Sequence, residues 1–200
     1  MMAINKRPIP LIGFAAYSGT GKTTLLCQII PLLKAQGLRI GVIKHAHHHF
    51  DIDYPQKDSY KLRKSGAETL LVTSRKRTAI IIEHPESAEE SNFEDALAKM
   101  PLEGLDLLLI EGFKWENFPK IELYRQQLNK PYLYPTDKNI IAIATDNSLE
   151  GNLEGSLNDI KNNTCSIIQL NLNNPPQIAD FIADFIANFI ADFIALESFK

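Results

Sequence analysis

Short apolar runs alternate along this chain with segments whose apolar residues recur at helical spacing. We expect the apolar runs to form strands at residues 10–16, 39–45, 68–73, 78–83, 107–110, 121–124, 140–144 and 166–170. The segments with helical spacing predict helices at residues 22–36, 58–64 and 93–100. Strands that alternate with helices favour a mainly parallel sheet covered by helices on both faces, with 121–124 as a candidate edge strand. The pattern therefore predicts a three-layer α/β domain over residues 1–174.

The last segment, residues 175–200, contains four tandem four-residue repeats. The repeats begin at Ala179, Ala183, Ala187 and Ala191, and each reads Ala, then Asp or Asn, then Phe-Ile. On an α-helix four residues advance a side chain by about 400°, so each repeat is rotated by about 40° from the one before. One straight groove therefore cannot bury all the Phe and Ile side chains. Two interpretations stay open: the helix docks on its own sheet and continues into a partner subunit, or its extra turns are a tolerated repeat expansion.

Composition narrows the class of protein. The chain has 200 residues, of which 44% are hydrophobic and 22% charged, with a formal net charge of −3 and a pI of about 6.0. This length fits one domain with its own core, and the charge does not suggest a general nucleic-acid binder. We find no signal-peptide pattern and no apolar stretch of the roughly 20 residues that span a bilayer. With two cysteines far apart in sequence, we expect a cytoplasmic protein that binds neither nucleic acid nor membrane.

The first predicted strand leads into a loop that resembles the Walker A motif, Gly-x₄-Gly-Lys-Ser/Thr. The loop reads Ala-Tyr-Ser-Gly-Thr-Gly-Lys-Thr from Ala16, so alanine replaces the first glycine. This departure is mild if Ala16 keeps a negative φ, because only a positive φ demands glycine. In such loops the backbone N–H groups bind phosphates, Lys22 reaches the β- and γ-phosphates, and Thr23 ligates Mg²⁺. This pattern predicts a P-loop nucleoside triphosphatase fold with a nucleotide site made of Ser18, Gly19, Thr20, Gly21, Lys22, Thr23 and Thr24.

A carboxylate at the end of a neighbouring buried strand completes the predicted Mg²⁺ site. The run 107–110 is followed by Glu111, which takes the place of the more usual aspartate. We expect Glu111 to hold Mg²⁺ or its water together with Thr23, and to take part in catalysis. The alternative is that Glu111 only caps the strand and pairs with Lys114. Asp106 begins the same strand and should lie at the opposite edge of the sheet, so it is left out of the site.

A polar loop follows the second predicted strand. Its histidines, at positions 45, 47, 48 and 49, suggest a metal site, but adjacent residues on an extended chain point to opposite faces and no cysteine is near. Ligands of open α/β folds bind at the carboxyl edge of the sheet, where this loop is expected. Asp58 is therefore a candidate catalytic carboxylate that approaches the Mg²⁺ or the attacking water, with Asp51 and Asp53 as further candidates. The alternative is a solvated acidic loop.

The residue that selects the base is expected after a late buried strand. The pair Asn129-Lys130 is followed by Pro131-Tyr132, so it lacks the aspartate of a guanine-reading Asn-Lys-x-Asp motif. Asp146 follows the strand at 140–144 and can accept hydrogen bonds from the N1–H and N2–H₂ groups of guanine, which adenine does not offer. The alternative is that Asp146 only starts a turn.

Four motifs together resemble the molybdopterin-guanine dinucleotide biosynthesis protein B family. They are the loop that begins at Ala16, Ile43-Lys44-His45-x-His47-His48, Lys57-Asp58-Ser59-Tyr60-x-Leu62-Arg63-Lys64-x-Gly66-Ala67, and Leu109-Ile110-Glu111-Gly112-Phe113-Lys114. The second and third motifs are much more specific than the phosphate loop. The resemblance covers residues 9–172 in rough outline.

The resemblance implies a GTP-binding protein with weak intrinsic GTPase activity, usually a homodimer, with GTP and Mg²⁺ as its ligands. It implies a helper role beside the guanylyltransferase that joins GMP to molybdopterin, and the partner does the transfer chemistry. Carried over by residue, the nucleotide site falls on Gly19, Gly21, Lys22, Thr23 and Thr24, with Glu111 as the acid. The resemblance also implies one short closing helix, so the four C-terminal repeats are a departure.

Charge suggests a further ligand. Lys44, Arg63 and Lys114 would suit a polyanion such as molybdopterin or the nucleotide, and the alternative is ordinary ion pairing. Two other functions stay open. A P-loop kinase of a small metabolite would need a lid that carries arginines. A metal-delivery GTPase would use the histidine run as its metal store.

Overall fold

The computed structural model describes residues 8–46, 50–85, 90–147 and 167–197. The chain forms two compact units: a core unit, Met1–His45 with Phe93–Lys200, and a hairpin unit, Ala46–Asn92. The strands and helices expected from the hydrophobic pattern are present, and their ends lie within two residues of the predicted bounds. The predicted domain boundary after residue 174 precedes the last helix directly, and as a domain boundary it stays a prediction.

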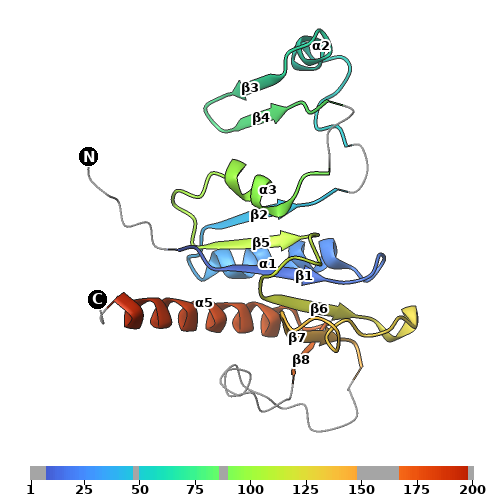
Figure 1. Ribbon diagram of the computed structural model, residues 1–200, viewed down its shortest axis with the longest axis vertical. Helices are drawn as coiled ribbons and strands as arrows, with labels where there is room; N and C mark the ends of the chain where they lie inside the picture. The colour runs from blue at the N-terminus through green and yellow to red at the C-terminus, as the bar shows by residue number, and fades with distance from the viewer. Residues whose placement is uncertain (1–7, 47–49, 86–89, 148–166, 198–200) are drawn as a thin grey trace. The chain divides into compact units, whose positions relative to one another are not determined.

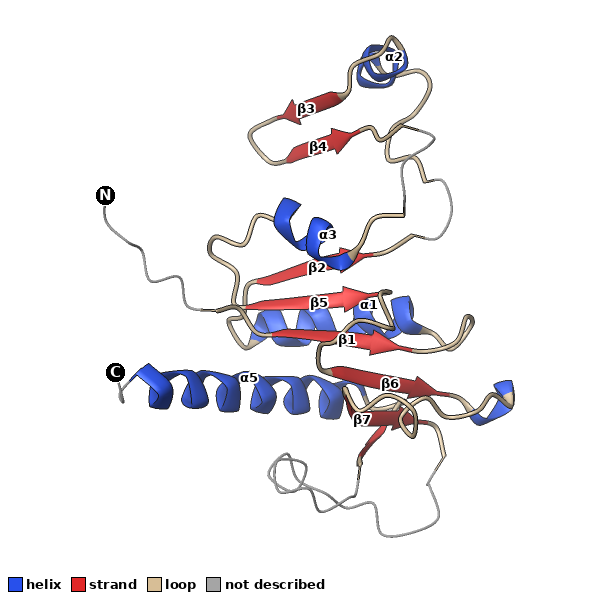
Figure 2. Cartoon of the chain, viewed as in Figure 1, coloured by secondary structure: helices blue, strands red, loops and turns tan. Residues whose placement is uncertain are grey.

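The core unit is built on a six-stranded sheet in the order β2-β5-β1-β6-β7-β8 (Figure 1). The strands are β1 (Leu11–Ala15), β2 (Ile40–Lys44), β5 (Leu107–Glu111), β6 (Lys120–Tyr124), β7 (Ile140–Thr145) and β8 (Ile168–Asn171). All neighbours are parallel, and the arrows in Figure 2 accordingly point the same way. The carboxyl ends of all six strands therefore lie along one edge of the sheet, where the predicted site residues follow their strands.

Helices cover both faces of this sheet. α1 (Lys22–Ala35) and α5 (Pro175–Glu197) contribute to one hydrophobic cluster, and α3 (Phe93–Lys99) contributes to the other. Strand β5 contributes side chains to both clusters. Leu107 and Leu109 belong to the cluster with α1 and α5, and Leu108 and Ile110 belong to the cluster with α3. Burial on both faces explains why this strand reads as a continuous apolar run. The prediction of a three-layer α/β fold is confirmed.

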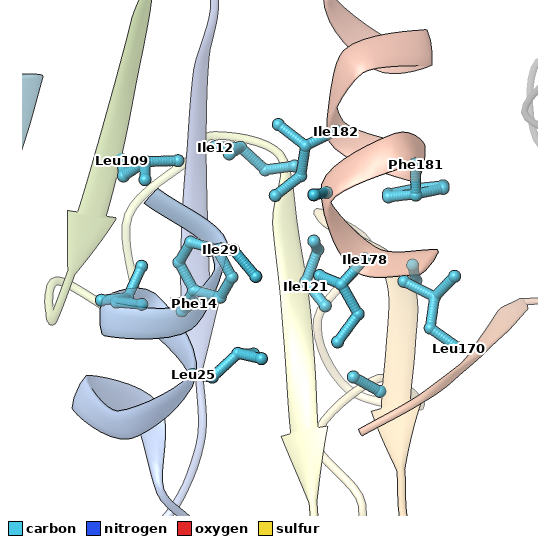
Figure 3. Packing of buried hydrophobic residues seen from close by; sticks show 14 of the residues in the cluster. Ile12, Phe14, Leu25, Ile29, Leu109, Ile121, Leu170, Ile178, Phe181 and Ile182 are labelled. Atoms are coloured by element: carbon cyan, nitrogen blue, oxygen red, sulfur yellow. The ribbon is translucent and has the colours of Figure 1, made fainter. Parts of the chain in front are cut away.

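The larger cluster joins α1, α5 and the middle of the sheet. Figure 3 shows the side chains that meet there: Ile12, Phe14, Leu25, Ile29, Ile121, Ile178 and Ile182. Each of these side chains is at most 3% exposed. Leu25 and Ile29 stand four residues apart, so they occupy the same face of α1 and dock that helix, which starts at the phosphate loop, on β1. This packing fixes the start of α1 at the carboxyl edge of the sheet.

One predicted position in the sheet is wrong. The sequence favoured 121–124 as an edge strand, but β6 lies between β1 and β7. Its polar residues Lys120 and Glu122 are each 1% exposed, and both have partners. Lys120 Nζ donates to Asp137 Oδ2 at 2.7 Å, and Glu122 accepts the backbone N–H groups of residues 133 and 134, each at 2.8 Å. These buried charges are satisfied inside the fold, so they do not mark a solvated edge.

Burial declines along the repeats of α5. Ile182 is fully buried, Ile186 is 5% exposed, Ile190 is partly buried and Ile194 is 60% exposed. Leu196, one residue after the last repeat, is 67% exposed. This gradient is the result expected when a repeat of four residues drifts around a helix that packs against one sheet. No helix in the described part of the chain is both long enough and apolar enough to cross a membrane.

The hairpin unit consists of α2 (Asp58–Lys64) and an antiparallel pair, β3 (Thr69–Thr73) and β4 (Thr78–Ile82). Arg63, whose side chain is only 8% exposed, makes ion pairs with both Asp51 and Glu83. These two hydrogen-bonded carboxylates raise the pKa of Arg63, with Glu83 as the larger cause. The guanidinium therefore ties the loop before α2 and the end of β4 to the helix. One face of the hairpin exposes apolar residues, because the cross-strand pair Leu71 and Ile80 is more than half exposed.

Candidate nucleotide-binding site

The loop between β1 and α1 has the backbone conformation of a phosphate loop. Gly19 (φ 82°) and Gly21 (φ 98°) adopt the left-handed conformations that favour glycine. Among the described residues other than glycine, only Phe113 and Asn129 have a positive φ, so alanine at position 16 introduces no strain. Gly21 is the N-cap of α1, and the first N–H groups of that helix lie at the end of the loop. The loop can therefore present backbone donors and a helix dipole to an anion.

Lys22 folds back over this loop. Its Nζ donates hydrogen bonds to the backbone oxygens of Ala16, at 3.0 Å, and Tyr17, at 3.4 Å. Burial lowers the pKa of Lys22, the carboxylate of Glu111 opposes this, and the charges of Lys114 and Lys44 lower the pKa further. The ammonium group is thus partly desolvated and held by neutral oxygens. A phosphate would supply the stronger, charged acceptor that this position lacks.

Thr23 and Glu111 meet at the same edge of the sheet. Thr23 Oγ1 donates to Glu111 Oε1 at 2.8 Å, and Lys44 Nζ lies 3.4 Å from Glu111 Oε2. Strands β1 and β2 are the two neighbours of β5, and Phe14 of β1 and Lys44 of β2 pair in register with Glu111. Thr23 reaches Glu111 because it lies on α1, the helix that follows β1. A hydroxyl and a carboxylate on adjacent elements are the oxygen ligands that Mg²⁺ prefers. The arrangement fits the predicted metal pair, and the lysine that contacts Glu111 is Lys44.

The turn after β5 is tightly constrained. Gly112 has a φ of 103°, and a Cβ atom at this position would lie 2.6 Å from the Cβ of His45. The next residue, Phe113, has a φ of 49° and stacks on the His45 ring with a centroid distance of 4.3 Å. Only glycine fits at position 112, because both space and backbone conformation exclude a side chain. The contact holds the ends of β2 and β5 together beside the phosphate loop.

Asp146 and Arg125 connect the phosphate loop to the strands on its other side. Arg125, the first residue after β6, donates from Nε to the backbone oxygen of Thr20 at 3.0 Å. Its Nη1 lies 3.4 Å from Asp146 Oδ2, and the N–H of Gln126 donates to Asp146 Oδ1 at 3.1 Å. Both oxygens of Asp146 thus already have partners within the chain. A guanine base that used Asp146 would have to replace at least one of them.

Asp106 lies where the sequence places it, away from this edge. It makes a bidentate ion pair with Arg39, at the start of β5 and just before β2. The amino ends of these parallel strands share the opposite edge of the sheet. The predicted position of Asp106, at the opposite edge of the sheet, is therefore confirmed.

Sequence comparison identifies the family. The family profile described as Molybdopterin guanine dinucleotide synthesis protein B, MobB, matches residues 11–146, which is more than half of the chain. The chain belongs to the MobB family.

Named relatives and solved MobB structures agree with this assignment. The molybdopterin-guanine dinucleotide biosynthesis adapter protein of Escherichia coli K12 is 47% identical over 156 residues, which cover 78% of this chain and 87% of that protein. The adapter protein of Haemophilus influenzae is 41% identical over 175 residues, 87% of this chain and 88% of that protein. A crystal structure of molybdopterin-guanine biosynthesis protein B has a TM-score of 0.63 at 23% identity, over 88% of this chain and 99% of that one. Bacillus subtilis MobB has a TM-score of 0.62 at 19% identity, over 88% and 97%.

These relatives bear on the open alternatives. The structural likeness confirms that the chain has the α/β fold of the solved MobB structures. The adapter relatives do not favour the metabolite kinase or the metal-delivery GTPase. Within the described residues of this MobB-family chain, no group of three or more His, Cys, Asp or Glu side chains is placed to hold a metal ion.

Several predicted site residues belong to the hairpin unit or lie outside the described part of the chain. Asp58 stands in the first turn of α2, is almost fully exposed, and pairs with Lys61 at 3.2 Å. Asp51 pairs with Arg63, and Asp53 Oδ1 accepts the N–H of Tyr54 at 3.0 Å. The roles proposed for these three aspartates stay predictions. The histidines at positions 47–49 lie outside the described residues.

Arg125 is the residue that the sequence reasoning missed. It follows β6 directly, and the sequence favoured that strand as an edge strand. In the fold β6 is the neighbour of β1, so the residue after β6 reaches the loop after β1. The signal available in the sequence was a basic residue directly after a predicted strand, which is the position where ligand contacts occur in parallel sheets. Arg63, by contrast, is engaged by two carboxylates and is poorly suited to hold an additional anion.

Proposed function

We propose that this chain binds GTP with Mg²⁺ at the loop between β1 and α1 and serves molybdopterin guanine dinucleotide biosynthesis as an adapter protein. The observation that carries the proposal is the meeting of Lys22, Thr23 and Glu111 at one sheet edge in a chain that belongs to the MobB family. Curated relatives named as adapter proteins of this biosynthesis support the role.

Each residue of the loop has a defined part in this proposal. The backbone of residues 18–24 surrounds the β- and γ-phosphates, with Gly19 and Gly21 providing the necessary conformations. Lys22 leaves the carbonyl oxygens of residues 16 and 17 and takes the phosphates instead. Thr23 and Glu111, which share a hydrogen bond, would hold Mg²⁺ or its water, and the ion would offset the negative charge of the phosphates. Glu111 is the proposed group for a weak hydrolysis of GTP, and the catalytic role of Asp58, which belongs to the hairpin unit, stays a prediction.

Guanine selectivity is assigned to Asp146. Its carboxylate can accept two hydrogen bonds from guanine, and it is held at the carboxyl end of β7 by Arg125 and the N–H of Gln126. Guanine would then exchange with one of these internal partners. Binding of the base would then change the contacts of Arg125, which also donates a hydrogen bond to the backbone oxygen of Thr20.

The protein partner in this proposal is the guanylyltransferase that forms molybdopterin guanine dinucleotide, in the cytoplasm, with molybdopterin as a further ligand. We also propose that the chain works as a homodimer. The support for self-association is the apolar surface of the last turns of α5, where Ile194 and Leu196 are more than half exposed. Ile194→Glu together with Leu196→Glu should then reduce the mass measured by light scattering from that of a dimer to that of a monomer. An unchanged mass would exclude this surface as the interface.

A nucleotide titration tests the central claim. Fluorescent GTP with Mg²⁺ is titrated into the wild type, Lys22→Ala and the control Lys34→Ala, with unlabelled GTP or ATP as competitor. Lys34 lies in the last turn of the same helix, so it tests a lysine of α1 away from the loop. Loss of charged hydrogen bonds should weaken binding about tenfold or more in Lys22→Ala only. Equal effects of the two variants would reject the site, and equal displacement by ATP would reject the guanine assignment.

The adapter role needs a separate measurement. Purified guanylyltransferase is supplied with molybdopterin and GTP, and formation of the dinucleotide is followed with and without this chain. Wild type and Lys34→Ala should increase the yield, whereas Lys22→Ala should not. A yield that does not depend on the added chain would contradict the role while leaving nucleotide binding intact.

A further inference from the structure

Trp115 is the most exposed large hydrophobic residue that the structure describes. It is 76% exposed and lies on the turn that follows β5, four residues after Glu111. An aromatic ring stabilises the folded state when it is buried, so an exposed ring contributes little to stability. The ring lies on the segment that follows the proposed metal ligand Glu111. We therefore interpret its exposure as a sign of a role in binding.

The turn that carries Trp115 is held from both sides. The N–H of Glu116 donates to the backbone oxygen of Phe113 at 3.1 Å, so Lys114 and Trp115 are the two central residues of a closed turn. On one side Phe113 stacks on His45 and meets Phe93 edge-on, with a centroid distance of 5.5 Å. On the other side Phe118 is buried in the cluster below α3. The turn therefore presents its two central side chains from a fixed base.

A positive charge accompanies the ring. Lys114 Nζ lies 4.8 Å from the centroid of the Trp115 ring, a cation–π distance. Lys44 lies at the end of the neighbouring strand, and its carboxylate partner is Glu111. When Glu111 serves Mg²⁺, as the proposed function requires, Lys44 loses that partner. The ammonium of Lys114, beside the exposed indole, and that of Lys44, at the end of β2, then remain to attract a second anion in addition to the triphosphate held by Lys22.

We propose that Lys114 and Trp115 form a binding platform for a fused-ring heterocycle that carries a phosphate, which is the chemistry of a pterin phosphate. The ring stacks on the indole, and the phosphate takes the ammonium groups of Lys114 and Lys44. The inference rests on the proposed function, because the adapter would hold this ligand beside the bound GTP. A guanine nucleotide shares the same chemistry, so the test separates the two sources.

Trp115 is the one tryptophan in the sequence, so tryptophan fluorescence, excited at wavelengths that the six tyrosines do not absorb, reports on this platform alone. The phosphate loop is first filled with a non-hydrolysable GTP analogue and Mg²⁺, and neopterin monophosphate is then titrated in. Saturable quenching is expected. Lys114→Gln should raise the Kd of neopterin monophosphate about tenfold, because a charged hydrogen bond is lost. The control Lys34→Gln removes an exposed lysine charge at the other end of α1 and should leave the Kd unchanged.

Calorimetry extends the test to variants without tryptophan. Trp115→Ala should weaken binding of neopterin monophosphate about tenfold, and Trp115→Phe should restore most of it, since loss of one stacking partner has this order of effect. Thermal unfolding of both variants should match the wild type, because an exposed ring contributes little to stability. Neopterin without phosphate should bind more weakly than the monophosphate, and inorganic phosphate alone should not quench.

Three outcomes would overturn the inference. They are an absence of saturable quenching by neopterin monophosphate, quenching that Lys114→Gln leaves unchanged, and quenching by the GTP analogue alone with none added by the pterin. The last outcome would assign the platform to the nucleotide. Fluorescent GTP binding is measured separately with Lys22→Ala. A negative result of the pterin titration therefore leaves the proposed nucleotide site intact, and a negative result of the GTP titration is recognised without any measurement on Trp115.

Discussion

Thr23 Oγ1 donates a hydrogen bond to Glu111 Oε1 at 2.8 Å across 88 residues of sequence. Thr23 is the second residue of α1, and Glu111 is the last residue of β5. The parallel pairing of β1 with β5 brings Phe14 opposite Glu111 and so places that carboxylate beside the helix that follows β1. The fold thus places a hydroxyl and a carboxylate side by side, which is the arrangement that the proposed Mg²⁺ site requires.

Replacement of Glu111 by glutamine should reduce the effect of Mg²⁺ on nucleotide binding. The amide keeps an oxygen for Thr23 but loses the charge that attracts the cation. Apparent Mg²⁺ affinity in the presence of GTP should fall about 10- to 100-fold, as for other losses of a metal-orienting group. The measurement is a Mg²⁺ titration of fluorescent GTP binding. Glu103→Gln, an exposed carboxylate before β5, is the control; the same Mg²⁺ dependence in both variants would remove Glu111 from the site.

The lowered pKa of Lys22 should make GTP binding depend on pH. Burial keeps this pKa below the ordinary value of 10.5, and a bound triphosphate favours the charged form and so raises the pKa. Affinity should therefore be full below the pKa of the free protein and decrease as the pH rises through it, by up to about tenfold per pH unit. Guanine also titrates at alkaline pH, so the informative quantity is the ratio of wild-type to Lys22→Ala affinity. A ratio independent of pH would contradict a role for the ammonium group.

Arg125 should couple the base side of the site to the phosphate loop. It contacts both the backbone oxygen of Thr20 and the carboxylate of Asp146. Asp146→Asn should reduce the preference for GTP over ATP, and Arg125→Gln should weaken GTP binding by loss of order in the loop. Because the two side chains touch, their effects on the Kd of GTP should depart from additivity by about 1 kcal/mol in a double-mutant cycle. Additive effects would show that Arg125 and Asp146 act independently.

The hairpin unit should depend on Arg63. Its guanidinium is almost completely buried between Asp51 and Glu83, so Arg63→Met would leave two carboxylates without their partner. We expect several-fold faster cleavage by limited proteolysis within residues 46–92. Lys64→Met, a neighbouring exposed lysine on the same helix, is the matched control. Equal cleavage rates for the two variants would mean that the ion pairs contribute little to the stability of this unit.

The sequence alone determined the elements and the phosphate loop, because both depend on local properties of the chain. The apolar runs and the helical spacing fix which segments can be buried, and the structure has these strands and helices with closely similar bounds. Gly19 and Gly21 have the positive φ that their positions in the motif require. The four motifs quoted for the family resemblance were sufficient to identify the MobB family, which the comparisons confirm.

Only the tertiary structure decided which of these segments are neighbours. Strand order depends on packing over the whole sheet, so a strand with Lys120 and Glu122 could be assigned to the edge from its sequence and still lie at the centre, with both charges satisfied by distant partners. The same placement brings Arg125 to Thr20, and the pairing of β1 with β5 brings Thr23 to Glu111. Each of these contacts joins residues far apart along the chain, and no local pattern encodes them. The residues of the phosphate loop can therefore be identified from the sequence, whereas the sheet decides that Arg125 and Glu111 lie beside that loop.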